Sequence, residues 1–170
     1  SMELSFEEIQ KNYNLHCKII NTYIKDEERK KKIFGMLEDL GENYILSPAS
    51  GKGWYHGAYA GGYLVHVNMV VKTALQIKNM YEKSTGTVVD FTDEELVFAA
   101  LFHDLGKIGL PTQPNYLPQD NDWFIKNRQE FFKNNPELDF MLIPDRSLFL
   151  LQKYGIQVSQ KEYLAIKLHD

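Results

Sequence analysis

The sequence predicts an all-α protein, a compact bundle of helices. Three capping boxes, in which Ser or Thr is followed three residues later by Glu, mark helix starts at Ser5, Thr92 and Ser159. Apolar residues after the first of these starts recur at helical spacing. No convincing stretch alternates between apolar and polar residues as a half-buried strand does, and the short GIQVS, residues 155–159, is the best candidate. Residues 1–170 suit one domain with its own core.

Two N-terminal helices are expected at about 5–25 and 26–40, and Gly41 is a natural stop for the second. Residues 42–62 follow, and they are rich in Gly, Ser and aromatic residues. This composition predicts a loop, and a long loop in a compact domain is often functional.

A long helix is expected from Gly62 to about Lys83, and because it is apolar on most faces we expect it to be central. The helix opened by Thr92 should end at His103-Asp104, with Gly106 at its left-handed C-terminal cap. Three prolines make the segment after it irregular. The remaining helices are expected at about 122–133, 145–154 and 159–170.

Composition and charge narrow the function classes. The net charge of −4 and the pI of about 5.7 argue against long nucleic acid as a partner, because such proteins usually carry a basic face. The one cationic run, ERKKK at residues 28–32, is interpreted as a solvated helix face. The sequence has no membrane-length apolar run and no signal-peptide pattern, and its single cysteine, Cys17, excludes an intrachain disulfide. We therefore expect a cytoplasmic protein without a membrane partner.

Two of the five histidines lie in apolar surroundings. His66 is embedded in GGYLVHVNMVV, and His103 follows an apolar helix and directly precedes Asp104. A buried imidazole needs a partner on each nitrogen or a metal on one, and a buried Asp is usually paired or coordinated. A single buried His is more often a core residue whose ring nitrogens both have hydrogen-bond partners. Two on separate helices, one beside an Asp, favour a shared first-row divalent cation.

Lys107 adds to this pattern. Gly106 lets the chain turn, so that the Lys107 ammonium can return over the predicted metal site. A cation beside a metal is unfavourable unless an anion lies between them, which predicts an anionic substrate, most simply a phosphate ester. A metal there would lower the pKa of a bound water, and Lys107 would offset developing charge.

At this point the sequence resembles a known family. His66, followed 37 residues later by His103-Asp104 within HDLGK, resembles the HD superfamily of metal-dependent phosphohydrolases. HGAYAGGYLVH, residues 56–66, is similar to the entry motif of a subset that includes HD-domain 3′–5′ exoribonucleases, although only one His of that motif's pair is present. The resemblance covers about residues 53–170 and implies a compact, all-α HD-domain bundle.

The resemblance implies roles for individual residues. His66, His103 and Asp104 would be metal ligands, Asp104 and Lys107 would be catalytic, and His56 would lie near the substrate. The implied cofactor is a divalent transition metal, one of Mn, Fe, Ni, Co or Zn. The implied activity is hydrolysis of a phosphomonoester or phosphodiester in a nucleotide or short oligonucleotide. The alternative is a catalytically weak HD-fold module that senses nucleotides or binds a partner.

The closing metal ligand of the family, an Asp on a later helix, leaves two alternatives open. Asp170, in EYLAIKLHD, is the candidate. The same stretch also resembles the one that precedes the family's closing helix, in which case the sequence stops before the true ligand. His169 is a candidate for binding a second metal or the substrate phosphate.

The remaining chemistry-bearing residues are expected to be structural. His16 and Cys17 are interpreted as ordinary helix positions. The aromatic residues before His66 are expected mainly in the core, with a stacking wall for a nucleobase as the alternative; they are Trp54, Tyr55, Tyr59 and Tyr63. Arg128 and Arg146 are expected in surface ion pairs.

Overall fold

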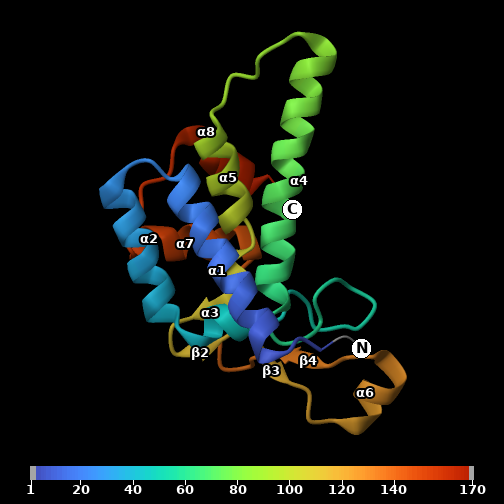
Figure 1. Ribbon diagram of the computed structural model, residues 1–170. Coiled ribbons are helices and arrows are strands. Elements are labelled where there is room, and N and C mark those ends of the chain that lie inside the picture. The colour runs from blue at the N-terminus through green and yellow to red at the C-terminus, as the bar shows by residue number, and fades with distance from the viewer. Residues whose placement is uncertain (1–2, 169–170) are drawn as a thin grey trace.

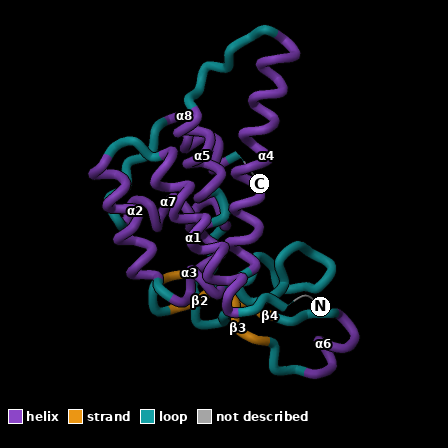
Figure 2. Tube along the Cα trace, viewed as in Figure 1, coloured by secondary structure: helices purple, strands orange, loops and turns teal. Residues whose placement is uncertain are grey.

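The computed structural model describes residues 3–168, and these residues confirm the all-α prediction. Helices α1 to α8 span Phe6–Tyr23, Glu27–Leu40, Glu42–Leu46, Gly62–Thr85, Asp93–Phe102, Asp122–Arg128, Ile143–Lys153 and Gln160–Lys167. A short 3-10 helix, η1, follows α5 at Leu105–Ile108. The strands are β1 (Gly109–Leu110), β2 (Gln113–Pro114), β3 (Tyr116–Pro118) and β4 (Phe132–Asn134). Figure 2 shows the strands gathered at one end of the helical body.

The three predicted capping boxes are confirmed. In each one the hydroxyl accepts a hydrogen bond from the backbone N–H of the Glu three residues later, and that carboxylate accepts one from the backbone N–H of the Ser or Thr. The pairs are Ser5–Glu8, Thr92–Glu95 and Ser159–Glu162. Gly41 ends α2 at a φ of 55°, a conformation that favours glycine, so this predicted stop is also confirmed.

Helix α5, rather than α4, is the central element of the core. Residues 97–102 of α5 are all buried, and α5 packs between α4 and α8. In α4 the fully buried residues end at Val71, and the second half projects beyond the helical body (Figure 1). Ile77 and Met80 are exposed there. The predicted central position therefore holds only for the first half of α4, because no neighbouring helix covers the rest.

Three segments differ from the prediction. Residues 42–46, expected in a loop, form α3. Helix α6 ends at Arg128, and the chain then enters β4, which pairs antiparallel with β3. Residues 156–159 join no strand. The observed strands are two or three residues long, and their pairing with distant partners, rather than any local alternation, defines them.

Two arginines are held inside the protein, contrary to prediction. Arg29, from the cationic run, bridges α2 to Glu94 at 3.2 Å and to Glu162 at 2.8 Å, with its guanidinium 3.7 Å from the centre of the Phe98 ring. Arg146, expected at the surface, is 3% exposed. It donates hydrogen bonds to the carbonyl oxygens of Gly106 and Asp139 and to the Asn115 amide oxygen. A buried guanidinium needs such partners because its donors are cut off from water.

Gly106 permits α7 to approach η1 closely. Its N–H donates to Ser147 Oγ at 2.8 Å, and Ser147 Oγ in turn donates to the His103 carbonyl oxygen at 3.0 Å. A Cβ on Gly106 would lie 2.4 Å from the carbonyl oxygen of Ile143. Gly106 lies inside η1 and not at the left-handed cap predicted for it, so lack of space requires the glycine there.

Gly106→Ala should lower the free energy of unfolding by about 1–3 kcal/mol, because the new methyl group collides with backbone that cannot move alone. Gly35→Ala is the matched control, since a Cβ there meets nothing within 4 Å. In the middle of α2 this control should raise stability by about 0.5–1 kcal/mol. Urea denaturation of both variants measures the difference. Equal stability of Gly106→Ala and the wild type would contradict the steric argument.

Candidate metal centre

Two imidazoles and one carboxylate converge where α4 meets the end of α5. His66 lies on the buried first half of α4, His103 is the C-terminal cap of α5, and Asp104 directly follows. Asp104 Oδ2 lies 3.2 Å from His103 Nε2 and 3.4 Å from His66 Nε2. One ligand atom from each residue lies within 4.8 Å of the others. The predicted convergence of these side chains is confirmed, whereas their binding of a metal stays a prediction.

The orientation of His103 is set by a backbone carbonyl. His103 Nδ1 lies 2.8 Å from the carbonyl oxygen of Ala100. Because a carbonyl oxygen only accepts, Nδ1 must carry a proton, and this contact directs Nε2 at Asp104 Oδ2, 3.2 Å away. A proton or a cation between these two atoms would stabilise so close an approach. A hydrogen bond of this kind behind the ring is also typical of histidines that bind metals.

Asp104 is suited to remain ionised although it is only 6% exposed. Burial by itself opposes ionisation, but hydrogen bonds from His103 and His66 and the positive charges of His103 and Lys107 outweigh it. Together they hold the pKa of the Asp104 carboxyl well below its usual range. The carboxylate is therefore available as an anionic ligand at neutral pH.

The spacing of these atoms fits one shared ion. Ligand atoms about 2.0–2.2 Å from a single ion lie up to about 4.4 Å apart when they face each other across it, and closer when they are adjacent, so separations of at most 4.8 Å are near those of a shared site. Two imidazole nitrogens and one carboxylate oxygen suit a first-row divalent metal. Three protein ligands would leave positions open for water or substrate.

Lys107 stands beside the cluster, as predicted. Its ammonium lies 3.4 Å from Asp104 Oδ2 and donates a hydrogen bond to the carbonyl oxygen of Ala49 at 2.9 Å. The side chain is 24% exposed and lines the adjoining hollow. The hydrogen bond to the Ala49 backbone holds the ammonium in place, and its exposed side can meet an incoming anion.

A hollow of about 520 Å³ opens over the cluster. His56 and His66 both line it, so His56 shares this hollow with a residue of the cluster, whereas its proximity to a substrate stays a prediction. Its other walls include residues that sequence reasoning did not single out: Lys52, Tyr116, Glu130, Phe132 and Lys133. No local signal could have identified these residues, because the β3–β4 hairpin and the 49–56 loop meet only in the fold.

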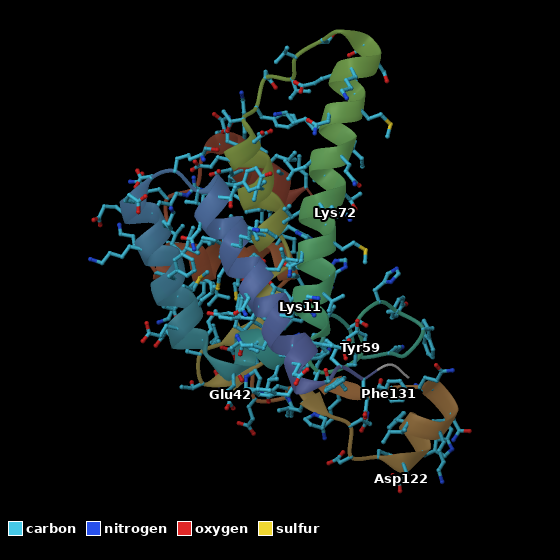
Figure 3. All side chains as sticks on the ribbon, in the orientation of Figure 1. Lys11, Glu42, Tyr59, Lys72, Asp122 and Phe131 are labelled. Atoms are coloured by element: carbon cyan, nitrogen blue, oxygen red, sulfur yellow. The ribbon has the colours of Figure 1, made fainter. Side chains whose placement is uncertain are left out.

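The backbone ties the two walls of the hollow together. The N–H of Phe131 donates to the carbonyl oxygen of Gly51, and the N–H of Gly53 donates to that of Gln129, each at 2.8 Å. Figure 3 shows Tyr59 at the foot of α4 and Phe131 nearby, and both line a second, smaller hollow. The walls are therefore held by main-chain contacts as well as by side chains.

The aromatic residues before His66 divide into two groups. Tyr63 is fully buried, in agreement with the core prediction. Trp54 and Tyr55 are 55% and 59% exposed, so for these two the core prediction is wrong. Tyr55 lines the hollow, which leaves the stacking role open to it.

Two candidate residues, His169 and Asp170, lie outside the described residues. Across residues 3–168, no helix combines the length and the apolar character needed to cross a bilayer. No family model, curated protein or solved structure matches the chain. The likeness to the HD superfamily thus rests on the motif alone, and the geometry of the cluster is a separate physical argument for a metal.

Proposed function

We propose that the protein is a divalent-metal-dependent phosphohydrolase of the HD superfamily that cleaves a phosphomonoester or phosphodiester in a nucleotide or short oligonucleotide. The observation that supports this most is the meeting of His66, His103 and Asp104 beside a lysine ammonium at the edge of a hollow. Histidines that only pack in a core would not need a lysine ammonium beside them at an open hollow.

The chemistry divides between the ion and the chain. A bound Mn, Fe, Ni, Co or Zn ion would lower the pKa of a water molecule and polarise a phosphoryl oxygen. Lys107 would offset negative charge that develops on the phosphoryl group. His56 is exposed at the mouth of the hollow, where its imidazole can hydrogen-bond to phosphate.

The hollow suits a small anionic substrate. Lys52, Lys107 and Lys133 line it together with a single acid, Glu130, although the protein as a whole carries a net charge of −4. A volume of about 520 Å³ falls within the usual range for small-molecule sites. Tyr55 and Tyr116 offer aromatic faces on which a base can stack. We also propose a cytoplasmic location, where nucleotides are available.

A second candidate function is supported by the number of ligands. Among residues 3–168, the cluster gathers three metal-binding side chains and not four. A centre with one ligand fewer would bind its ion more weakly, and the pocket would then serve nucleotide sensing or partner binding without turnover. Metal content and turnover together distinguish the two functions.

The wild type, purified without chelators, should contain about one transition-metal ion per chain and hydrolyse at least one member of a nucleotide panel assayed with Mn²⁺, Ni²⁺, Co²⁺, Zn²⁺ and Mg²⁺. His103→Ala and Asp104→Asn should lose both metal and activity, because each removes a ligand. Elemental analysis beside phosphate release measures both properties.

The matched control is Asp122→Asn, which changes an exposed carboxylate and should alter neither property. Asp170→Ala in the same series decides whether that residue closes the site, since it would then lose as much metal as Asp104→Asn. Metal without turnover on any substrate would favour the sensing module. A wild type without metal and without turnover would contradict the phosphohydrolase and leave the sensing module as the better supported function.

A further inference from the structure

A second hollow adjoins the candidate metal centre along α4. Its volume is about 380 Å³, and His56 and His66 line it as they line the larger hollow. Tyr59, at the foot of α4 (Figure 3), lines it as well. His66 is also the member of the metal cluster that α4 contributes. One imidazole of the cluster therefore stands at the boundary between two hollows.

The second hollow is a groove formed by neighbouring rows of side chains on α4. Residues four apart on a helix lie in one row. One row begins at His66 and continues through Val70 and Ala74, and the next includes Met69 and Ile77. The helix rises about 16 Å between His66 and Ile77. The groove therefore begins at the cluster and is long enough for an extended organic group.

The two hollows differ in chemistry. Three lysines and a glutamate line the larger one, whereas no Asp, Glu, Lys or Arg of the described chain lines the groove. The α4 wall of the groove is mainly apolar, and its residues Met69 and Ile77 are 61% and 60% exposed. Scattered apolar residues are ordinary on a protein surface, but an apolar hollow that meets polar groups at one end is typical of a ligand site.

Continuity with the cluster indicates what would occupy the groove. A phosphomonoester has one organic substituent, and the larger hollow already offers a nucleoside the aromatic faces of Tyr55 and Tyr116. A phosphodiester has two substituents on one phosphorus atom. Because His66 lines both hollows, a phosphoryl group held at the cluster could direct one substituent into each. The apolar walls of the groove suit a substituent without charge.

We propose that the substrate is a phosphodiester that joins a nucleotide to an apolar alcohol, with the nucleoside in the larger hollow and the apolar group in the α4 groove. In its hydrolysis the oxygen of a water molecule bonds to phosphorus, and the bond from phosphorus to the alcohol oxygen breaks. The alcohol leaves with one proton of that water, and the other proton passes to solvent. The products are a nucleoside monophosphate and the free alcohol. This inference rests on the proposed function and narrows its substrate class.

Octyl and methyl esters of the four ribonucleoside 5′-monophosphates test the inference, because each pair shares the phosphodiester and differs only in apolar length. The wild type should hydrolyse at least one octyl ester with a kcat/KM about 10–100-fold above that of its methyl ester. Each buried methylene group favours binding by a factor of about 4, and the groove is only partly enclosed. Calorimetric titration of the metal-free protein with the same pair should show the same preference without turnover.

Two substitutions in the groove should reduce this preference. Ile77→Glu places a carboxylate where the octyl chain would lie, and should bring the ratio of the two kcat/KM values close to 1. Met69→Gln makes the wall polar without adding charge and should lower the ratio several-fold. Both positions are exposed, so neither change disturbs the core. Gln76→Glu is the matched control, because it adds the same charge as Ile77→Glu at an exposed position of α4 outside the groove.

Equal kcat/KM values for octyl and methyl esters would overturn this inference and leave the proposed function standing. The same conclusion would follow if Ile77→Glu and Gln76→Glu changed the preference equally, or if only nucleoside monophosphates were hydrolysed. Sedimentation tests a different occupant: a wild-type dimer that Ile77→Glu dissociates would show that a second copy covers the groove, and would also overturn the inference. If neither these esters nor the nucleotide panel were hydrolysed, the phosphohydrolase and this inference would fail together.

Discussion

Lys107→Met should retain the metal and fold normally, yet lower kcat by about 10²–10³. The ammonium is a cation beside Asp104 and cannot coordinate an ion, so its removal takes away no ligand. Methionine keeps most of the stem that lies between Ala49 and the hollow. What is lost is the positive charge that would meet the phosphoryl group, and this charge acts most strongly in the transition state.

Phosphate-release kinetics beside metal analysis separates Lys107→Met from His103→Ala, which should lose both properties. Lys31→Met, at an exposed position of α2, is the charge-matched control and should change neither. If Lys107→Met turned over substrate as fast as the wild type, Lys107 would be only a residue at the end of a helix. If it lost its metal, the charge would instead be needed to assemble the cluster.

Acidification should destabilise the metal-free protein through His16 by about 3 kcal/mol between pH 6.5 and pH 4. Burial lowers the pKa of His16 to about 4, partly opposed by its hydrogen bond with Asn68. In the unfolded chain the same imidazole has a pKa of about 6.5. Between these values the unfolded chain binds a proton that the folded protein does not, so the stabilisation is complete above about pH 6.5 and is lost as the pH falls toward 4.

Denaturant unfolding at a series of pH values, with a chelator present, measures this loss. Other groups titrate in the same range, so the informative quantity is the difference between the wild type and His16→Gln, which should narrow by about 3 kcal/mol as the pH falls. His56→Gln, at an exposed position, is the control and should show no such narrowing. A pH-independent difference between wild type and His16→Gln would mean that folding does not lower the pKa of His16.

The sequence by itself determined where most helices begin and which residues form the candidate metal cluster. A capping box closes through hydrogen bonds within four residues, so Ser5, Thr92 and Ser159 could be read without the fold. His103 and Asp104 were identifiable for a similar reason: a polar pair at the end of an apolar helix is conspicuous in the sequence. Their convergence with His66 was expected because two histidines in apolar surroundings on separate helices, one beside an Asp, favour a shared cation, and the three side chains do meet.

The tertiary structure decided what surrounds that cluster. The hollow exists because the β3–β4 hairpin meets the 49–56 loop, and strands this short leave no periodic signal in the sequence. The partners of Arg146 come from η1 and from two loops, so its burial could not be read from α7 alone. His16 is buried between Asn68 of α4 and Tyr44 of α3, which are distant from it in sequence. Local hydrogen bonds can be predicted from neighbouring residues, whereas burial and long-range contacts depend on which surfaces the folded chain brings together.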